Sequence, residues 1–238
     1  MNNFIELSEI KKASQLLKGV VIKSPFQKTK SYSKKYNSNI FFKREDLQNV
    51  RSFKIRGAFN KISSLTKSQS INGLVCASAG NHAQGFAVSC TNFGYKGRVY
   101  MPKSTSNQKI EMVRKFGKNN IEIILFGENF SQAYKMALKD CHDHNKIFIH
   151  PFDDIKVITG QATLFLEIID QIDNELDYLF IPIGGGGLIS GAINVFKQIS
   201  PQTKIIGIEP KGAPSMFQSL KKNRLVKLDK IDRFVDGI

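Results

Sequence analysis

The sequence has no tryptophan and only three cysteines among its 238 residues. Cys76, Cys90 and Cys141 are odd in number and lack Cys-x-x-Cys spacing, which argues against a disulfide framework and against a cysteine-based zinc site. Cys76 and Cys90 stand in apolar surroundings, so we expect both in the core. The four histidines also lack the spacing of a metal site, and we expect no bound metal.

Long apolar runs are also missing, so no segment is predicted to span a bilayer. The first 17 residues predict a mildly amphipathic helix that carries Glu6 and Glu9. Transit peptides are poor in acidic residues, and no apolar stretch with a cleavage site is present. We therefore expect a cytoplasmic protein with no membrane partner.

Acidic residues are few, with 20 against 35 lysines and arginines, which gives a net charge of +15. Such an excess is typical of nucleic-acid-binding proteins. Here, however, the lysines are spread along the whole chain, singly or in pairs such as Lys11-Lys12 and Lys34-Lys35. Because no basic stripe is interleaved with aromatic residues, we expect no nucleic-acid partner.

Short apolar runs alternate with longer amphipathic segments along most of the chain. Strands are predicted over residues 39–43, 73–77, 98–101, 121–125, 147–149, 178–183 and 204–208. Helices are predicted over 55–65, 106–116, 129–144, 155–172, 188–199 and 213–220, and another begins at Asn81. This alternation predicts an α/β fold with open parallel sheets covered by helices. Ligands bind at the carboxyl ends of such strands, so the segments after Ala77, Ile183 and Ile208 are candidate sites.

Lys54 lies at the centre of the segment Arg51-Ser52-Phe53-Lys54-Ile55-Arg56-Gly57. A lysine amine forms a Schiff base with an aldehyde only when it is deprotonated. Burial and nearby cations both lower a lysine pKa, and Arg51 and Arg56 are candidate cations. Phe53 offers an aromatic face for packing. Taken alone, the segment favours an ordinary surface lysine at the start of a helix, and only the rest of the chain changes that interpretation.

The run Gly184-Gly185-Gly186-Gly187 follows a predicted strand and precedes a helix. Glycines let the backbone wrap an anion closely, and a helix N-terminus favours negative charge. A dinucleotide fingerprint would require glycine at Ile189 or Ser190, and no phosphate-binding lysine motif is present. The run therefore predicts a phosphorylated ligand that is neither NAD nor ATP.

Residues 78–82, Ser-Ala-Gly-Asn-His, also stand between a strand and a helix. Ser78 and the helix N-terminal amides suit a carboxylate, and Asn81 suits a ring hydroxyl or phenolate. The alternative is a plain N-cap. His82 is expected to support this loop rather than to act as a base. Glu167 and Asp170, on a predicted helix, are interpreted as surface charges.

A Schiff-base lysine, a phosphate loop and a carboxylate loop together describe a pyridoxal phosphate enzyme acting on an amino acid. The sequence resembles the fold-type II (tryptophan synthase beta-like) pyridoxal phosphate enzymes, and within them the threonine dehydratase (threonine ammonia-lyase) group. The resemblance runs from about residue 5 to the last residue. It rests on Lys43-Arg44-Glu45-Asp46, Ser52 to Ala58, Ser78 to Gly85, Pro151-Phe152-Asp153, Gly160-Gln161 and Gly184 to Leu188.

This resemblance implies two domains: a large cofactor-binding domain of residues 1–68 and 150–238, and a small domain of residues 69–149. It implies that pyridoxal 5′-phosphate is bonded to Lys54, which would also remove the Cα proton of the substrate. The other implied cofactor-binding residues are Phe53 beside the ring, Asn81 at its 3-hydroxyl oxygen, and Gly184, Gly185, Gly186, Gly187 and Leu188 at the phosphate. The implied substrate-binding residues are Ser78, Ala79, Gly80 and His82.

The implied reaction removes water from L-threonine and gives 2-oxobutanoate and ammonia, a step of isoleucine synthesis. The alternatives are an L-serine dehydratase and a serine racemase-like enzyme. Ala79 stands where serine racemases carry a second serine that acts as acid and base, which favours dehydration. Ser215 replaces a carboxylate of the relatives' cation site near Glu209-Pro210, so no Mg²⁺ is expected.

Catalytic domains of this family continue past Asp236-Gly237-Ile238, where the chain ends. We therefore expect a C-terminally truncated fragment that lacks the group meeting the pyridine nitrogen. An inactive remnant is the third alternative, and the full-length form is expected to be a homo-oligomer.

Overall fold

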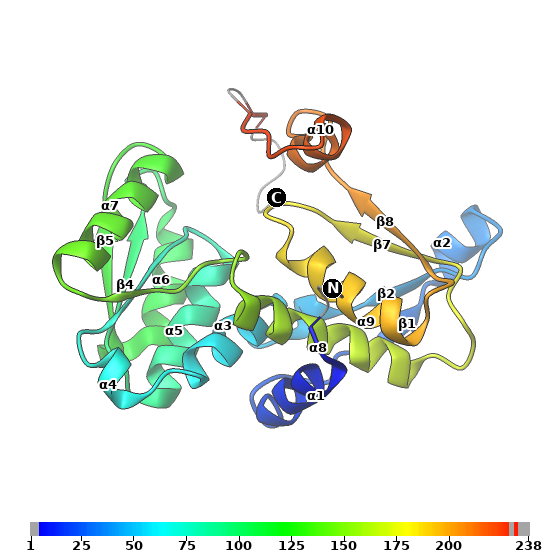
Figure 1. Cartoon of the computed structure of the whole chain (residues 1–238), viewed down its shortest axis with the longest axis horizontal. Coiled ribbons are helices and arrows are strands. Elements are labelled where there is room, and N and C mark those ends of the chain that lie inside the picture. The colour runs from blue at the N-terminus through cyan, green and yellow to red at the C-terminus, as the bar shows by residue number, and fades with distance from the viewer. Residues whose placement is uncertain (1–4, 229–230, 233–238) are drawn as a thin grey trace.

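The computed structural model describes residues 5–228 and 231–232 (Figure 1). The start of the predicted first helix and the closing residues Asp236, Gly237 and Ile238 lie outside the described residues. Across the part that is described, none of the helices is both long enough and apolar enough to cross a membrane. Within the described residues, the strands form three sheets of four, two and two strands.

The four-stranded sheet is wholly parallel, as predicted, with the order β5-β4-β3-β6. Its strands are β3 (Leu74–Ala77), β4 (Gly97–Met101), β5 (Ile121–Leu125) and β6 (Ile147–Phe148), and its helices are α5 (Asn81–Phe93), α6 (Asn107–Gly117) and α7 (Phe130–Asp143). Successive side chains of a strand point to opposite faces. Leu74 and Cys76 therefore share one core with α5 and α6, whereas Val75 and Ala77 pack with α7. Both faces are buried, and Cys76 and Cys90 lie in the core as expected.

The other two sheets and the helices around them lie on the other side of the molecule (Figure 1). Strands β7 (Tyr178–Pro182) and β8 (Lys204–Ile208) pair in parallel. The helices here are α1 (Leu7–Leu16), α8 (Ile155–Gln171), α9 (Gly187–Ile199) and α10 (Ser215–Lys222). Ile10, Phe165, Ile181 and Phe196 belong to a core that α1, α8, β7 and α9 share. The predicted division into two domains, with boundaries at residues 68 and 150, stays a prediction.

Helix α3 (Lys54–Ser63) joins the two sides because it packs against both α5 and α8. Its contact with α8 is very close: a Cβ on Gly160 would lie 2.4 Å from the carbonyl oxygen of Arg56. A Cβ on Gly57 would likewise lie 2.4 Å from Nε2 of Gln161. Glycines at both positions let the helices approach, and this contact sets where Lys54 lies.

Several predicted elements need correction. Strand β1 (Phe26–Lys28) was missed, and its pairing with β2 (Phe41–Lys43) is antiparallel rather than parallel. The short helices α2 (Lys30–Lys35), η1 (Glu45–Leu47), α4 (Lys67–Ser70) and η2 (Lys118–Asn120) were also missed. Helix α3 begins at Lys54 itself and not at Ile55. The missed strand and the missed helices are short and largely exposed, so hydrophobic periodicity carries no signal for them.

Candidate active site

Lys54 is the first residue of α3 and is half-buried. Its Nζ donates a hydrogen bond of 2.9 Å to the carbonyl oxygen of Pro151 and lies 5.4 Å from the centre of the Phe53 ring. Burial lowers the pKa of the Lys54 amine to about 8. The expected help from Arg51 and Arg56 is not the cause, because burial accounts for the change. A substantial neutral fraction near physiological pH makes Lys54 a competent nucleophile and base.

Arg56 is fully buried and is not an unpaired cation. Its Nε and Nη2 each donate to Glu45 over 2.8 Å, and its Nη1 donates to Glu167 over 2.7 Å. The interpretation of Glu167 as a surface charge is therefore wrong, since a buried guanidinium pairs with it. Asp170 is exposed, as predicted, and lies 3.6 Å from Lys23.

The glycine loop, residues 184–187, follows β7 and opens α9. Gly186 has a φ of +86°, a conformation that side chains disfavour. A Cβ on Gly185 would lie 2.2 Å from a ring carbon of Phe152, and one on Gly187 would lie 2.8 Å from the Phe152 carbonyl oxygen. Glycine is thus required sterically, and Phe152 supports the loop. Leu188 packs its side chain on the neighbouring core, which leaves backbone amides as the groups that hold an anion.

Residues 78–82 continue β3 into α5. The Ser78 amide donates to the Tyr100 carbonyl over 3.1 Å, and the Ser78 hydroxyl accepts from the Gly80 amide over 3.1 Å. Asn81 is exposed, and open space surrounds the position where Gly80 would carry a Cβ. Ala79 lies between Ser78 and Gly80 and is partly exposed. The loop therefore presents its backbone at the carboxyl end of the sheet, where the sequence predicts it.

His82 is fully buried on the first turn of α5, and its Nε2 lies 2.9 Å from the carbonyl oxygen of Ile149. A carbonyl only accepts, so Nε2 carries the proton and Nδ1 has a free lone pair. Burial and the Lys54 charge lower the pKa of His82 to about 3. The ring is therefore neutral and is tied to Ile149. That His82 supports the loop rather than acting as a base stays a prediction.

Residues 149–153 complete the site, and none of them was predicted as a site residue. Lys54 bonds the carbonyl of Pro151, His82 bonds that of Ile149, and Phe152 contacts the glycine loop. His150 holds this segment: its Nδ1 accepts from the Asp153 amide over 2.7 Å, and its ring meets Phe152 edge-on at 4.6 Å. Only the motif Pro151-Phe152-Asp153 signalled the segment, because carbonyl acceptors leave no trace in a sequence.

Lys54, the glycine loop and the Ser78 loop are thus connected through residues 149–153. A partly neutral amine suits an aldehyde, and the backbone amides of the glycine loop at the N-terminus of α9 suit a phosphate. No cluster of His, Cys, Asp or Glu that could hold a metal occurs within the described ranges.

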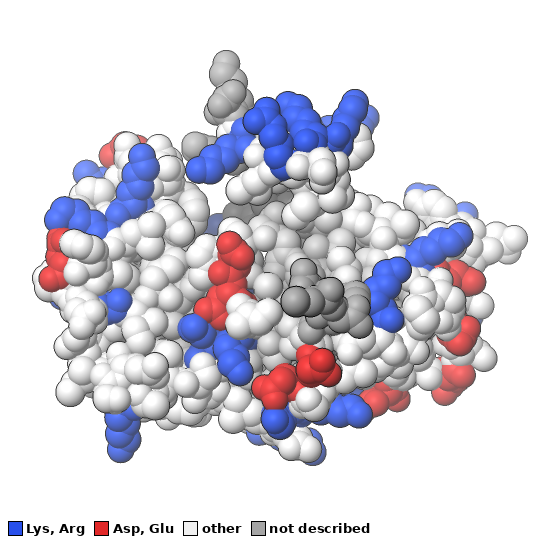
Figure 2. Space-filling model, in the orientation of Figure 1, with Lys and Arg blue, Asp and Glu red and all other residues white. Residues whose placement is uncertain are grey.

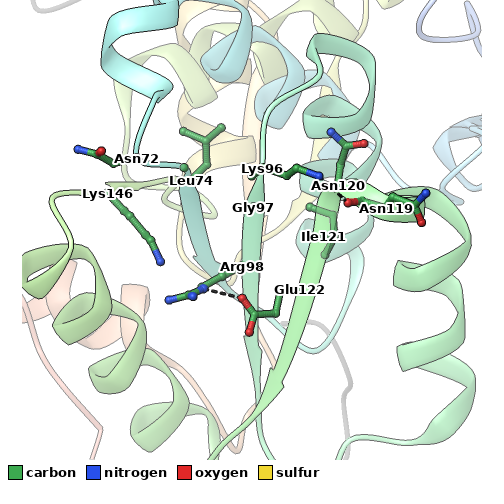
Figure 3. A pocket seen from close by; sticks show the side chains of 11 residues that line it. Asn72, Leu74, Lys96, Gly97, Arg98, Asn119, Asn120, Ile121, Glu122 and Lys146 are labelled. Atoms are coloured by element: carbon green, nitrogen blue, oxygen red, sulfur yellow. Dashed lines mark hydrogen bonds and ion pairs between the residues drawn. The ribbon is translucent and has the colours of Figure 1, made fainter.

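A pocket of about 360 Å³ lies elsewhere, at the amino ends of β3, β4 and β5 (Figure 3). Arg98 in this pocket pairs with Glu122 over 2.6 Å and with Asp140 over 2.9 Å, and Lys146 pairs with Asp140. Its charges are satisfied internally, and ligands of parallel sheets bind at the opposite edge. On the face shown in Figure 2, basic side chains are dispersed, with the densest group over α10, where Lys221 and Lys222 lie.

Comparison with known proteins places this site in context. The family model described as "Pyridoxal-phosphate dependent enzyme" matches residues 17–238. The L-threonine dehydratase biosynthetic IlvA of Halalkalibacterium halodurans is 51% identical over 233 residues, which cover 98% of this chain and 56% of that protein. The protein of the same name from Bacillus subtilis is 51% identical over 236 residues, with coverages of 99% and 56%.

Solved structures agree with these relatives. The processed form of threonine deaminase isoform 2 from Solanum lycopersicum has a TM-score of 0.91 at 40% identity and covers 99% of this chain and 65% of that one. Maize serine racemase has a TM-score of 0.89 at 30% identity, with coverages of 95% and 68%. The chain spans 56% of the length of the curated relatives described above.

Proposed function

Because the chain belongs to the pyridoxal-phosphate-dependent enzyme family, we propose that it is the cofactor-binding part of an L-threonine dehydratase. The reaction removes water from L-threonine and returns water in a final hydrolysis, so that threonine gives 2-oxobutanoate and ammonia, as in isoleucine synthesis. The observation that supports it is Lys54, whose amine has a pKa of about 8 and is linked through Pro151 and Phe152 to the glycine loop. Relatives named L-threonine dehydratase, at 51% identity, support the choice of substrate.

Lys54 has two roles in this proposal. Its neutral amine would hold the cofactor at its aldehyde, and Nζ would take the proton from the substrate Cα. When bound, pyridoxal phosphate supplies an electron sink for the resulting negative charge. Half-burial beside the Phe53 ring keeps the pKa low, so that Nζ takes up and releases a proton near neutral pH.

The remaining residues bind and orient. We propose that the amides of Gly184, Gly185, Gly186, Gly187 and Leu188 hold the phosphate, and that Asn81 bonds the ring 3-hydroxyl oxygen. The substrate carboxylate is assigned to the Ser78 hydroxyl and to the amides of Ala79, Gly80 and His82. The His82 side chain is buried and neutral, so the backbone amide is the group that His82 offers to the carboxylate.

A serine-specific dehydratase or a serine racemase-like enzyme is the second candidate. Threonine and serine differ by one methyl group, which a pocket discriminates only modestly. Two observations favour threonine dehydration: Ala79 has no hydroxyl to deliver a proton, and maize serine racemase is 30% identical against 51% for the dehydratases. A cytoplasmic location, a homo-oligomeric full-length form and the domain boundaries at residues 68 and 150 belong to the same proposal.

The experiment combines cofactor binding with turnover. The purified chain, supplied with pyridoxal phosphate, should develop a visible absorbance band, and should release 2-oxobutanoate from threonine faster than pyruvate from serine. Lys54→Ala should abolish the band and the product, whereas Lys115→Ala, at an exposed position of α6, should leave both unchanged. Absence of the band in the unsubstituted chain refutes the proposal. Formation of D-serine from L-serine favours the second candidate.

A further inference from the structure

We propose that Arg56 is a positioning residue, which fixes the first turn of α3 and thereby holds Lys54 Nζ at the Pro151 carbonyl. The proposal rests on the function proposed above only in taking Lys54 as the reactive lysine. It assigns a role to four buried or nearly buried charged side chains, here called the ion network: Lys43, Glu45, Arg56 and Glu167.

The ion network connects four elements, three of which lie within residues 41–63, whereas the fourth lies far along the chain. Lys43 lies on β2, Glu45 on η1, Arg56 on α3 and Glu167 on α8. Arg56 uses both edges of its guanidinium, with Nε and Nη2 on Glu45 and Nη1 and Nη2 on Glu167, at 2.7–3.0 Å. Paired bonds of this kind fix the plane and the position of the group as well as its charge. Arg56 is therefore held from two sides in one orientation.

The other charged side chains of the ion network also have hydrogen-bond partners. Lys43 Nζ donates to Glu167, to the Ser24 carbonyl and to Gln171 within 2.7–2.8 Å. Glu45 also accepts from the Ser24 hydroxyl over 2.6 Å. Two cations and two carboxylates leave no net charge, which explains why Arg56 adds no repulsion at Lys54. A fully satisfied buried network is rigid and specifies one arrangement.

Local interactions do not hold the first turn of α3 by themselves. The N-cap residue Phe53 makes no side-chain cap hydrogen bond, and Arg51, three residues before Lys54, has a φ of +56°. A non-glycine residue in that region is strained and persists only when its surroundings enforce it. Arg56 lies two positions after Lys54 and ties the same turn to η1 and α8. The geometry thus makes the ion network the anchor of the turn that carries Lys54.

The test uses substitutions that keep every charge and change only the shape. Arg56→Lys loses the paired geometry, and Glu167→Asp shortens one partner by a methylene. In both, Lys54 should become better solvated, so its pKa should rise from about 8 toward the ordinary 10.5. The neutral fraction near pH 7.5, and with it the reactivity of Lys54, should fall by about tenfold.

Reactivity is measured on the full chain without cofactor, by competitive labelling with trace acetic anhydride from about pH 6 to about pH 11. Peptide mass spectrometry compares Lys54 with exposed Lys11 as the internal standard. Phe196→Leu is the stability control, since Phe196 packs against Phe165 in the core between α8 and α9. It should lower the unfolding midpoint but leave the Lys54 labelling profile in place.

The positioning role is supported if the pH midpoint of Lys54 labelling rises in Arg56→Lys or Glu167→Asp and does not rise in Phe196→Leu. An unchanged Lys54 profile in the folded charge-preserving variants overturns it, and so does an equal change in Phe196→Leu. If Arg56→Lys fails to fold, the milder Glu167→Asp decides alone. Labelling needs no cofactor, so a failed dehydratase assay and a failed positioning role give different results.

Discussion

Gly185→Ala tests the shape of the glycine loop directly. The added Cβ would lie 2.2, 2.3 and 2.4 Å from three ring carbons of Phe152, whereas real Cβ contacts are essentially never under 3.0 Å. The ring has little freedom to retreat, because His150 packs edge-on against it at 4.6 Å. The loop must therefore move by about an ångström, and overpacking of this kind costs about 1–3 kcal/mol.

If this cost falls on the arrangement of amides that binds the phosphate, affinity for pyridoxal phosphate drops by about 5- to 150-fold. Titration of the chain with the cofactor, followed by absorbance, measures the change. Gly94→Ala is the matched control: its φ of +70° makes alanine strained there, yet it ends α5 away from the glycine loop and meets no atom within 4 Å. It should lower stability and leave cofactor affinity unchanged.

A second substitution checks the cause. Phe152→Ala, combined with Gly185→Ala, removes the ring carbons that the new methyl group meets. The two changes should then be non-additive, with the double variant binding cofactor better than the sum of the single effects predicts. Affinity within twofold of the unsubstituted chain in Gly185→Ala, or strict additivity in the pair, refutes the steric account of this loop.

Three further outcomes are expected. Folding lowers the pKa of Lys54 from 10.5 to about 8. Between about pH 8 and pH 10.5 the unfolded state therefore binds more protons than the folded state, so the free energy of unfolding rises with pH over this range. Urea midpoints at both ends of that window should show this gain in the unsubstituted chain and lack it in Lys54→Met; parallel midpoints contradict the assignment. His82, with a pKa of about 3, should show no titration of its ring resonances by NMR between about pH 5 and pH 8. Glu45→Ala leaves Arg56 with one carboxylate and should cost about 3–5 kcal/mol in chemical denaturation, whereas a cost near zero would mean that water replaces Glu45.

The parallel sheet was predictable because both of its faces are buried. Leu74 and Cys76 enter one core while Val75 and Ala77 enter another, so β3 is a continuous apolar run. Strand β1 shows the opposite case: Gln27 and Lys28 are exposed, and only pairing with β2 makes the segment a strand. Such a strand depends on a partner elsewhere in the chain, which periodicity does not reveal.

The site divides in the same way. The glycine loop is visible in the sequence because a run of four glycines marks it, and Lys54 becomes a candidate once that loop and the Ser78 loop are considered with it. The carbonyls of Ile149 and Pro151 are not, because every residue has a carbonyl and only the fold selects which ones face His82 and Lys54. Backbone carbonyls that accept hydrogen bonds from site residues are therefore identified only from the structure.

Glu167 falls between these cases, because the sequence around it contains a usable signal. Thr163, Glu167 and Gln171 recur every four residues on α8 and so lie on one face of the helix. Thr163 accepts from Arg56, Glu167 pairs with Arg56 and Lys43, and Gln171 accepts from Lys43. A polar row on a mainly apolar helix needs polar partners if that face is buried. The two cations that this row requires stand in the motif segments at Lys43 and Arg56, so pairing the row with those segments is enough to locate the ion network in the sequence.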